Sequence, residues 1–141
     1  PAMSNDLKES YLNTHYKVDA FVQPIHIGRV SAEADALLAA NRLEEWAYIT
    51  AYNPLSVALP PAENEKRNLE LLNDVKQYIV IPGEGQGKDG AWPAEKSFFV
   101  AGITLDAAQQ LAVRYDQHAF VYGRLHRAAE LVETLPIWPA S

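Results

Sequence analysis

The sequence of residues 60–75, PPAENEKRNLELLNDV, is typical of a helix, but one side of that helix is half polar and half apolar. Pro60 and Pro61 suit the start of a helix, where a missing backbone N–H costs nothing. Positions 64, 67, 68, 71 and 75 are three or four residues apart and therefore lie along one side of the helix. The second half of this stripe, Leu71 and Val75, is apolar and predicts a side that faces the core.

The first half of the stripe is polar and consists of Asn64, Arg67 and Asn68. Polar groups are costly to bury unless they are hydrogen-bonded. If this side faces the core, its polar side chains are less exposed than Glu65, Lys66 and Glu70 on the same helix.

Arg67 carries the strongest constraint of the three, because a guanidinium does not lose its charge in a protein. It must be paired, hydrated or bound to a ligand. We expect it to reach a carboxylate or a backbone carbonyl, with Glu95 as the preferred partner and Glu63, one turn back on the helix, as the local alternative.

The composition indicates one soluble domain. The chain has 141 residues, of which 48% are hydrophobic, and it has no cysteine, so disulfides and thiolate metal sites are excluded.

Residues 1–3 are expected to be a cloning remnant and start, residues 4–126 a single α+β domain, and residues 127–141 a short helix and tail. We expect a cytoplasmic protein, because no apolar run crosses a bilayer and the start is polar. The formal charge of −6 argues against a nucleic-acid partner.

The hydrophobic pattern predicts the order α-β-α-β-α-β-β-α-β. Helices are predicted over 5–16 with Ser4 as N-cap, after the N-cap Ser31, over 60–75 and after the N-cap Thr104, with a further short helix within 126–134. Strands are predicted over 20–28, 46–52, 78–82, 97–103 and 119–125. The directly joined strands 78–82 and 97–103 should pair antiparallel. This order predicts an α+β or mixed α/β fold, with a mostly antiparallel or mixed sheet of about five strands and helices mainly on one face.

The Gly-rich stretch 83–95, GEGQGKDGAWPAE, is predicted to be a hairpin connection. A phosphate-binding loop needs Lys followed by Ser or Thr and then a helix, whereas here Asp89 follows Lys88 and a strand comes next. The four histidines show no spacing typical of metal ligands. We therefore expect neither a metal nor a cofactor, although a connection of this length often carries function.

Further polar residues lie at the ends of predicted strands. Asn53 follows one strand, while Glu95 and Gln117 each precede another. Together with the polar half of the helix stripe, these residues could form a self-satisfied structural network or a polar ligand pocket. The sequence leaves both alternatives open.

Four motifs in order resemble the bacterial family known as domain of unknown function 3293, DUF3293. They are ITAYNP at 49–54, ENEKRNLELL at 63–72, PGEGQGKDGAWPAEKSFFVAGI at 82–103 and YDQHAFVYG at 115–123. The resemblance extends from about residue 8 to about residue 125. It implies a small bacterial domain without an assigned activity, and it marks Thr50, Asn53, Pro54, Glu63, Asn64, Asn68, Gly83, Trp92, Glu95, Ser97, Gln117, Ala119 and Phe120.

Three functional hypotheses follow. In the first, a small polar or anionic ligand binds at the strand ends, held by Arg67 and oriented by Asn53, Asn64, Asn68, Ser97 and Gln117. Trp92 would close over the ligand, and Glu95 would act as general base if the pocket is catalytic.

In the second hypothesis, Trp92 and Trp138 dock a protein partner and no chemistry occurs. In the third, the polar residues only brace the helix against the sheet. An open cleft with converging polar groups would favour the first hypothesis, whereas sealed and mutually bonded groups would favour the third.

Overall fold

Six strands form one antiparallel sheet in the computed structural model, which describes residues 3–87 and 93–134. The strands are β1 (His15–Val18), β2 (Glu45–Ile49), β3 (Ile79–Gln86), β4 (Glu95–Ala101), β5 (Ala119–Arg124) and β6 (Glu130–Glu133). They lie in the order β1-β3-β4-β2-β5-β6. The helices are α1 (Asn5–Leu12), α2 (Ala32–Ala40), α3 (Pro61–Val75) and α4 (Leu105–Arg114), with a 3₁₀ turn η1 (Pro54–Ser56). The predicted α+β class is confirmed, with six strands rather than about five.

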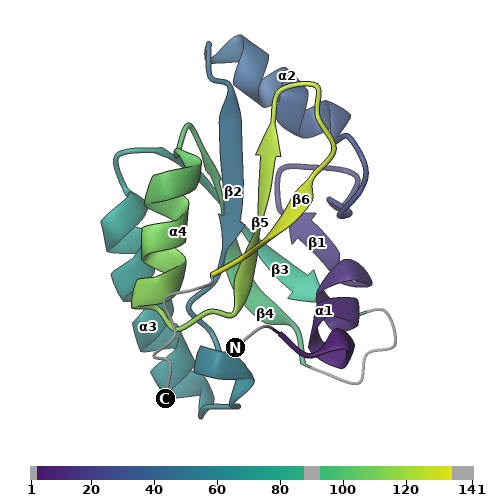
Figure 1. Ribbon diagram of the computed structural model, residues 1–141. Helices are drawn as coiled ribbons and strands as arrows, with labels where there is room; N and C mark the ends of the chain where they lie inside the picture. Colours follow the sequence, from purple (N-terminus) through teal and green to yellow (C-terminus); the bar gives the residue numbers. More distant parts are fainter. Residues whose placement is uncertain (1–2, 88–92, 135–141) are drawn as a thin grey trace.

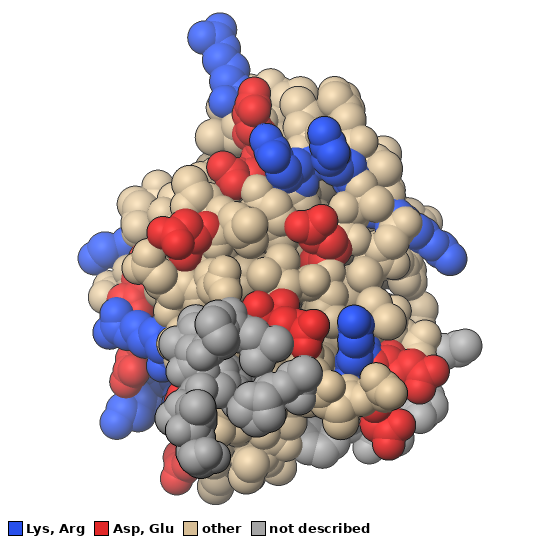
Figure 2. All heavy atoms as spheres, in the orientation of Figure 1, with Lys and Arg blue, Asp and Glu red and all other residues tan. Residues whose placement is uncertain are grey.

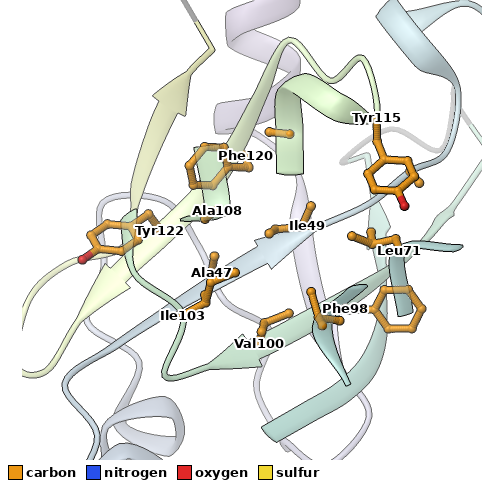
Figure 3. Packing of buried hydrophobic residues seen from close by; sticks show 13 residues of the cluster. Ala47, Ile49, Leu71, Phe98, Val100, Ile103, Ala108, Tyr115, Phe120 and Tyr122 are labelled. Atoms are coloured by element: carbon orange, nitrogen blue, oxygen red, sulfur yellow. The ribbon is translucent and has the colours of Figure 1, made fainter. Parts of the chain in front are cut away.

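Each face of the sheet has its own core. The two longer helices, α3 and α4, cover one face, where Leu71 packs with Ile49 and Phe98 (Figures 1 and 3). The shorter helix α2 covers the other face, where Leu38 belongs to the same cluster as Trp46 and Phe99. Because side chains alternate along a strand, neighbouring residues of β2 and β4 belong to different cores.

The order of the central strands brings three chain segments together. Strand β2 lies between β4 and β5 and is antiparallel to both. The register places Ile49 opposite Phe98 and Tyr48 opposite Val121. The carboxyl end of β2 therefore lies between the amino ends of β4 and β5.

Several local predictions are confirmed. The β3–β4 pair is antiparallel, with Val80 opposite Val100. Ser4, Ser31 and Thr104 each cap a helix by accepting a backbone hydrogen bond from the residue three positions later.

The predicted short helix within 126–134 is wrong, because residues 130–133 form β6. This strand pairs with β5, placing Val132 opposite Phe120 and against the core. Pairing with a preformed strand and burial of Val132 outweigh the local helix preference of the sequence.

Two other boundaries also differ from the predictions. Residues 20–28, predicted to be a strand, make only isolated bridges through Ile25 and Ile27. The strand at this edge of the sheet is β1, whose first two residues, His15 and Tyr16, fall within the helix predicted over 5–16. Residues 83–86 continue β3 instead of opening the Gly-rich loop. Their pairing with both β1 and β4 explains this extension, since long-range hydrogen bonds outweigh the weak strand preference of Gly.

No helix in the described part of the chain has both the length and the apolar character needed to cross a membrane.

Gly83 and Gly85 provide a test of the packing between β1 and β3. A Cβ at Gly83 would lie 1.8 Å from the carbonyl oxygen of Lys17, whereas one at Gly85 would meet nothing nearer than 3.6 Å. We predict that Gly83→Ala lowers the free energy of unfolding by about 2–3 kcal/mol, because the backbone of β1 must move. Gly85→Ala should change it by less than about 1 kcal/mol. Urea denaturation compares the two variants, and equal effects would contradict the close strand contact.

Candidate functional site

The polar side of α3 lies against residues 50–53, which continue the chain beyond β2. Asn68 accepts a hydrogen bond from the N–H of Ala51 at 2.9 Å and donates one to the carbonyl of Lys96 at 2.8 Å. Asn64 accepts from the N–H of Asn53 at 2.8 Å. These amides satisfy backbone groups at the point where the strand ladder stops, which explains why they face inward.

Arg67 completes this arrangement by bonding two carbonyls from different segments. Its Nε donates to Ala51 at 2.7 Å and its Nη2 to Tyr115 at 2.5 Å, while the carboxylate of Asp116 lies 3.9 Å away. The expected carbonyl contact is confirmed. The guanidinium thus ties α3 to the end of β2 and to the end of α4.

The preferred partner Glu95 and the alternative Glu63 were both wrong. Glu95 shares the sheet face of Ser97 and Phe99, whereas Phe98 faces α3. The alternation along β4 therefore directs the Glu95 side chain away from Arg67.

The exposures follow the predicted stripe. Asn64 and Asn68 are 4% and 5% exposed. The side chain of Arg67 is 24% exposed, against 47% for Glu65, and Lys66 and Glu70 are exposed as well. The inward side of α3 is confirmed.

Asn53 links this network to Glu95. Its side-chain oxygen accepts from Asn64 at 2.8 Å and from the N–H of Leu59 at 3.2 Å, and its Nδ2 donates to Glu95 Oε2 at 2.7 Å. Its φ of 47° is in the left-handed region, which Asn adopts more readily than most residues. Leu55 and Ser56 also have positive φ. Backbone strain of this kind concentrates at functional sites.

Gln117 serves the same structural purpose from the β5 side. Its Nε2 donates to the carbonyl of Tyr52 at 2.9 Å and to that of Tyr115 at 3.1 Å, and the side chain is buried. We call the five side chains that hold residues 50–53 and their surroundings the brace: Asn53, Asn64, Arg67, Asn68 and Gln117.

A cavity of about 570 Å³ lies on the opposite face of the sheet, beneath α1. Of the predicted site residues, Glu95 and Ser97 line it, whereas no member of the brace does. Trp92 lies outside the described residues. The remaining lining comes from Asp6, Leu7, Glu9, Ser10, Tyr11, Asn13, Thr14, Tyr16, Tyr48, Thr50, Ser56, Gly85, Gly87, Ala119, Phe120 and Val121.

The sequence predictions missed the aromatic part of this lining. Tyr11 falls within the helix predicted over residues 5–16 and is not among the predicted site residues. The alternation in β2 was the available signal, because Tyr48 and Thr50 share the face opposite Ile49. The position of α1 over that face could not be predicted from the chain order.

The cavity lining contains three tyrosines, whose phenol groups are neutral. Burial raises the pKa of Tyr11, Tyr16 and Tyr48 above its usual value. The nearby charge of Glu95 raises the pKa of Tyr11 and Tyr16 further. The Tyr16 hydroxyl donates to the carbonyl of Tyr11 at 2.6 Å, and the Tyr48 hydroxyl to that of Lys17 at 2.7 Å.

Within residues 3–87 and 93–134, no three His, Cys, Asp or Glu side chains come together in a group that could hold a metal ion.

The family model described as "Protein of unknown function (DUF3293)" matches residues 49–120. The chain belongs to the DUF3293 family. The matched segment runs from the end of β2 to the start of β5, so it contains the brace, Glu95 and Ser97 but not α1. It is shorter than the resemblance expected from the sequence motifs. No curated protein and no solved structure matches this DUF3293 chain.

The two carbonyl contacts of Arg67 predict a measurable loss of stability. Arg67→Ala should lower the free energy of unfolding by about 2–4 kcal/mol, because hydrogen bonds from a charged donor are lost and two carbonyls are left without that donor. Lys66→Ala, at the exposed neighbouring position, should change it by no more than about 0.5 kcal/mol. Urea denaturation measures both. A loss below about 1 kcal/mol for Arg67→Ala would mean that water replaces the guanidinium.

The Asn53–Glu95 contact predicts a pH-dependent variant. Asn53→Asp keeps the acceptor for Leu59 and tolerates positive φ, but it places a second carboxylate beside Glu95. We expect a loss of about 1–3 kcal/mol at pH 7.

This loss should shrink as the pH falls. The like charge raises the pKa of the folded pair above the unfolded value of about 4. The folded variant therefore takes up a proton before the unfolded chain does, and stability returns. Denaturation at pH 7 and pH 5, with Asn73→Asp on the exposed side of α3 as control, tests this; a loss independent of pH would contradict it.

Proposed function

We propose that this DUF3293 protein binds a small molecule in the cavity between α1 and the sheet, with the carboxylate of Glu95 as its anchoring hydrogen-bond acceptor. One observation carries the proposal: a carboxylate in the wall of a 570 Å³ cavity is held by Asn53 at 2.7 Å. The volume lies within the range of small-molecule sites, roughly 300–1,000 Å³.

The brace supports this role without contacting the ligand. Among the described residues, no buried side-chain nitrogen or oxygen lacks a hydrogen-bond partner. Asn53 and Asn64 bond each other, while Arg67, Asn68 and Gln117 bond backbone groups, which supports a structural role for the brace. Asn64 fixes Asn53, and Asn53 fixes Glu95, so the carboxylate is positioned before any ligand arrives.

The structure gives no support to Arg67 as an anion-binding group. Its guanidinium bonds two backbone carbonyls and does not line the cavity. We therefore place the ligand at Glu95 and not at the polar stripe of α3. If the site is catalytic, Glu95 is the candidate general base.

The alternative of a protein-binding module depends on Trp92 and Trp138, which both lie outside the described residues. Nucleic acid is not our proposed partner. On the face shown in Figure 2, Lys and Arg are interspersed with Asp and Glu, whereas nucleic-acid binding favours a basic patch.

A pair of α1 variants tests the cavity. Ser10 lines the cavity and is exposed, while Lys8 is exposed on the same helix and does not line it. A thermal-shift screen of metabolites should find ligands that stabilise the wild type and Lys8→Phe. Ser10→Phe should abolish the shift, because its bulky ring occupies part of the cavity that Glu95 lines and obstructs the ligand. A ligand that stabilises all three proteins equally would place binding elsewhere and contradict the proposal.

A further inference from the structure

We propose, building on the ligand site above, that the ligand is an organic cation: a protonated amine attached to an aromatic or similarly flat apolar body. The inference comes from the charge and the chemical character of the cavity lining.

All the charged side chains in the described lining are acidic. They are Asp6 and Glu9 on α1 and Glu95 on β4, with no Lys, Arg or His among them. Lys96, next to Glu95 in sequence, lines a different pocket, and its ammonium lies 2.8 Å from the carboxylate of Glu65. A partly enclosed site with this charge attracts a cation and disfavours an anion, because the interaction is screened less than in bulk water.

The position of Glu95 within this lining makes it the main charge for a bound group. Glu95 is half-buried, whereas Asp6 and Glu9 are exposed on α1. Its negative charge reaches the neighbouring phenols, since it raises the pKa of both Tyr11 and Tyr16. An ammonium beside Glu95 would form a charge-assisted hydrogen bond, which is roughly twice as strong as a neutral one.

The rest of the lining suits an apolar body. Leu7 and Val121 contribute aliphatic surface, alongside the rings of the tyrosines. The hydroxyl groups of Tyr16 and Tyr48 already donate their protons in hydrogen bonds to backbone carbonyls. These two residues therefore offer mainly ring surface, which attracts both apolar groups and cations.

A metal ion fits this lining less well than an organic cation. No group of three or more potential ligands converges within the described residues. A cavity of about 570 Å³ is also much larger than a single ion requires.

Three ligands with one skeleton and different charges test the inference. They are 2-phenylethylamine, 2-phenylethanol and 3-phenylpropanoate, titrated into the full chain by isothermal calorimetry at pH 7. We expect the amine to bind at least about 10-fold more tightly than the alcohol, which corresponds to about 1.4 kcal/mol. The carboxylate should bind most weakly.

Variants locate the source of this preference. Glu95→Gln should weaken amine binding by about 10-fold while changing alcohol binding by less than about 3-fold, because only the amine loses a charge-assisted bond. Glu95→Asp keeps the charge and should retain a preference for the amine. Ser10→Phe should remove binding of the amine and the alcohol, and Lys8→Phe should retain both.

The outcomes separate this inference from the proposed function. Equal binding of amine and alcohol, removed by Ser10→Phe, would overturn the cation inference and leave the ligand site standing. Tighter binding of the carboxylate would do the same. If none of the three ligands binds, or if Ser10→Phe and Lys8→Phe behave alike, both the inference and the ligand site are wrong. The comparison of the three ligands on the wild-type protein tests the cation preference even if Glu95→Gln does not fold.

Discussion

The hydrogen bonds of Asn68 to Ala51 and Lys96 are the constraint on which the rest of the site depends. Strand β2 ends at Ile49, yet the chain continues between two neighbouring segments with its backbone groups buried. Those groups must find partners, because a buried amide or carbonyl without one is costly. The amides of α3 supply them, and in doing so they fix how the helix lies on the sheet.

The same constraint reaches the other face of the sheet through a short chain of contacts. Asn64 holds Asn53, and Asn53 turns left-handed to reach Glu95. Because residues alternate along β4, Phe98 packs into the α3 core while Glu95 and Ser97 line the cavity under α1. A helix on one side of the sheet thereby positions a carboxylate on the other.

Different residues serve stability and the proposed binding of a ligand: the brace stabilises the fold, and the cavity lining forms the ligand site. The residues that the sequence made most conspicuous, Asn64, Arg67 and Asn68, are structural and are satisfied by backbone groups. The cavity wall is instead built largely from phenols and short side chains, each ordinary in its local sequence. The family match contains the brace, Glu95 and part of the cavity wall, but not α1.

The sequence by itself determined the α+β class, the caps of three helices, the β3–β4 hairpin and the inward side of α3. These features follow from residue spacing and short-range hydrogen bonds, which a single segment contains. The partner of Arg67, the strand β6 and the cavity under α1 were decided only by tertiary structure. Residues 130–133 become a strand because β5 offers them an edge, and Glu95 turns from Arg67 because Phe98 occupies the α3 side. Such choices depend on which distant segments meet, and local sequence does not contain that information.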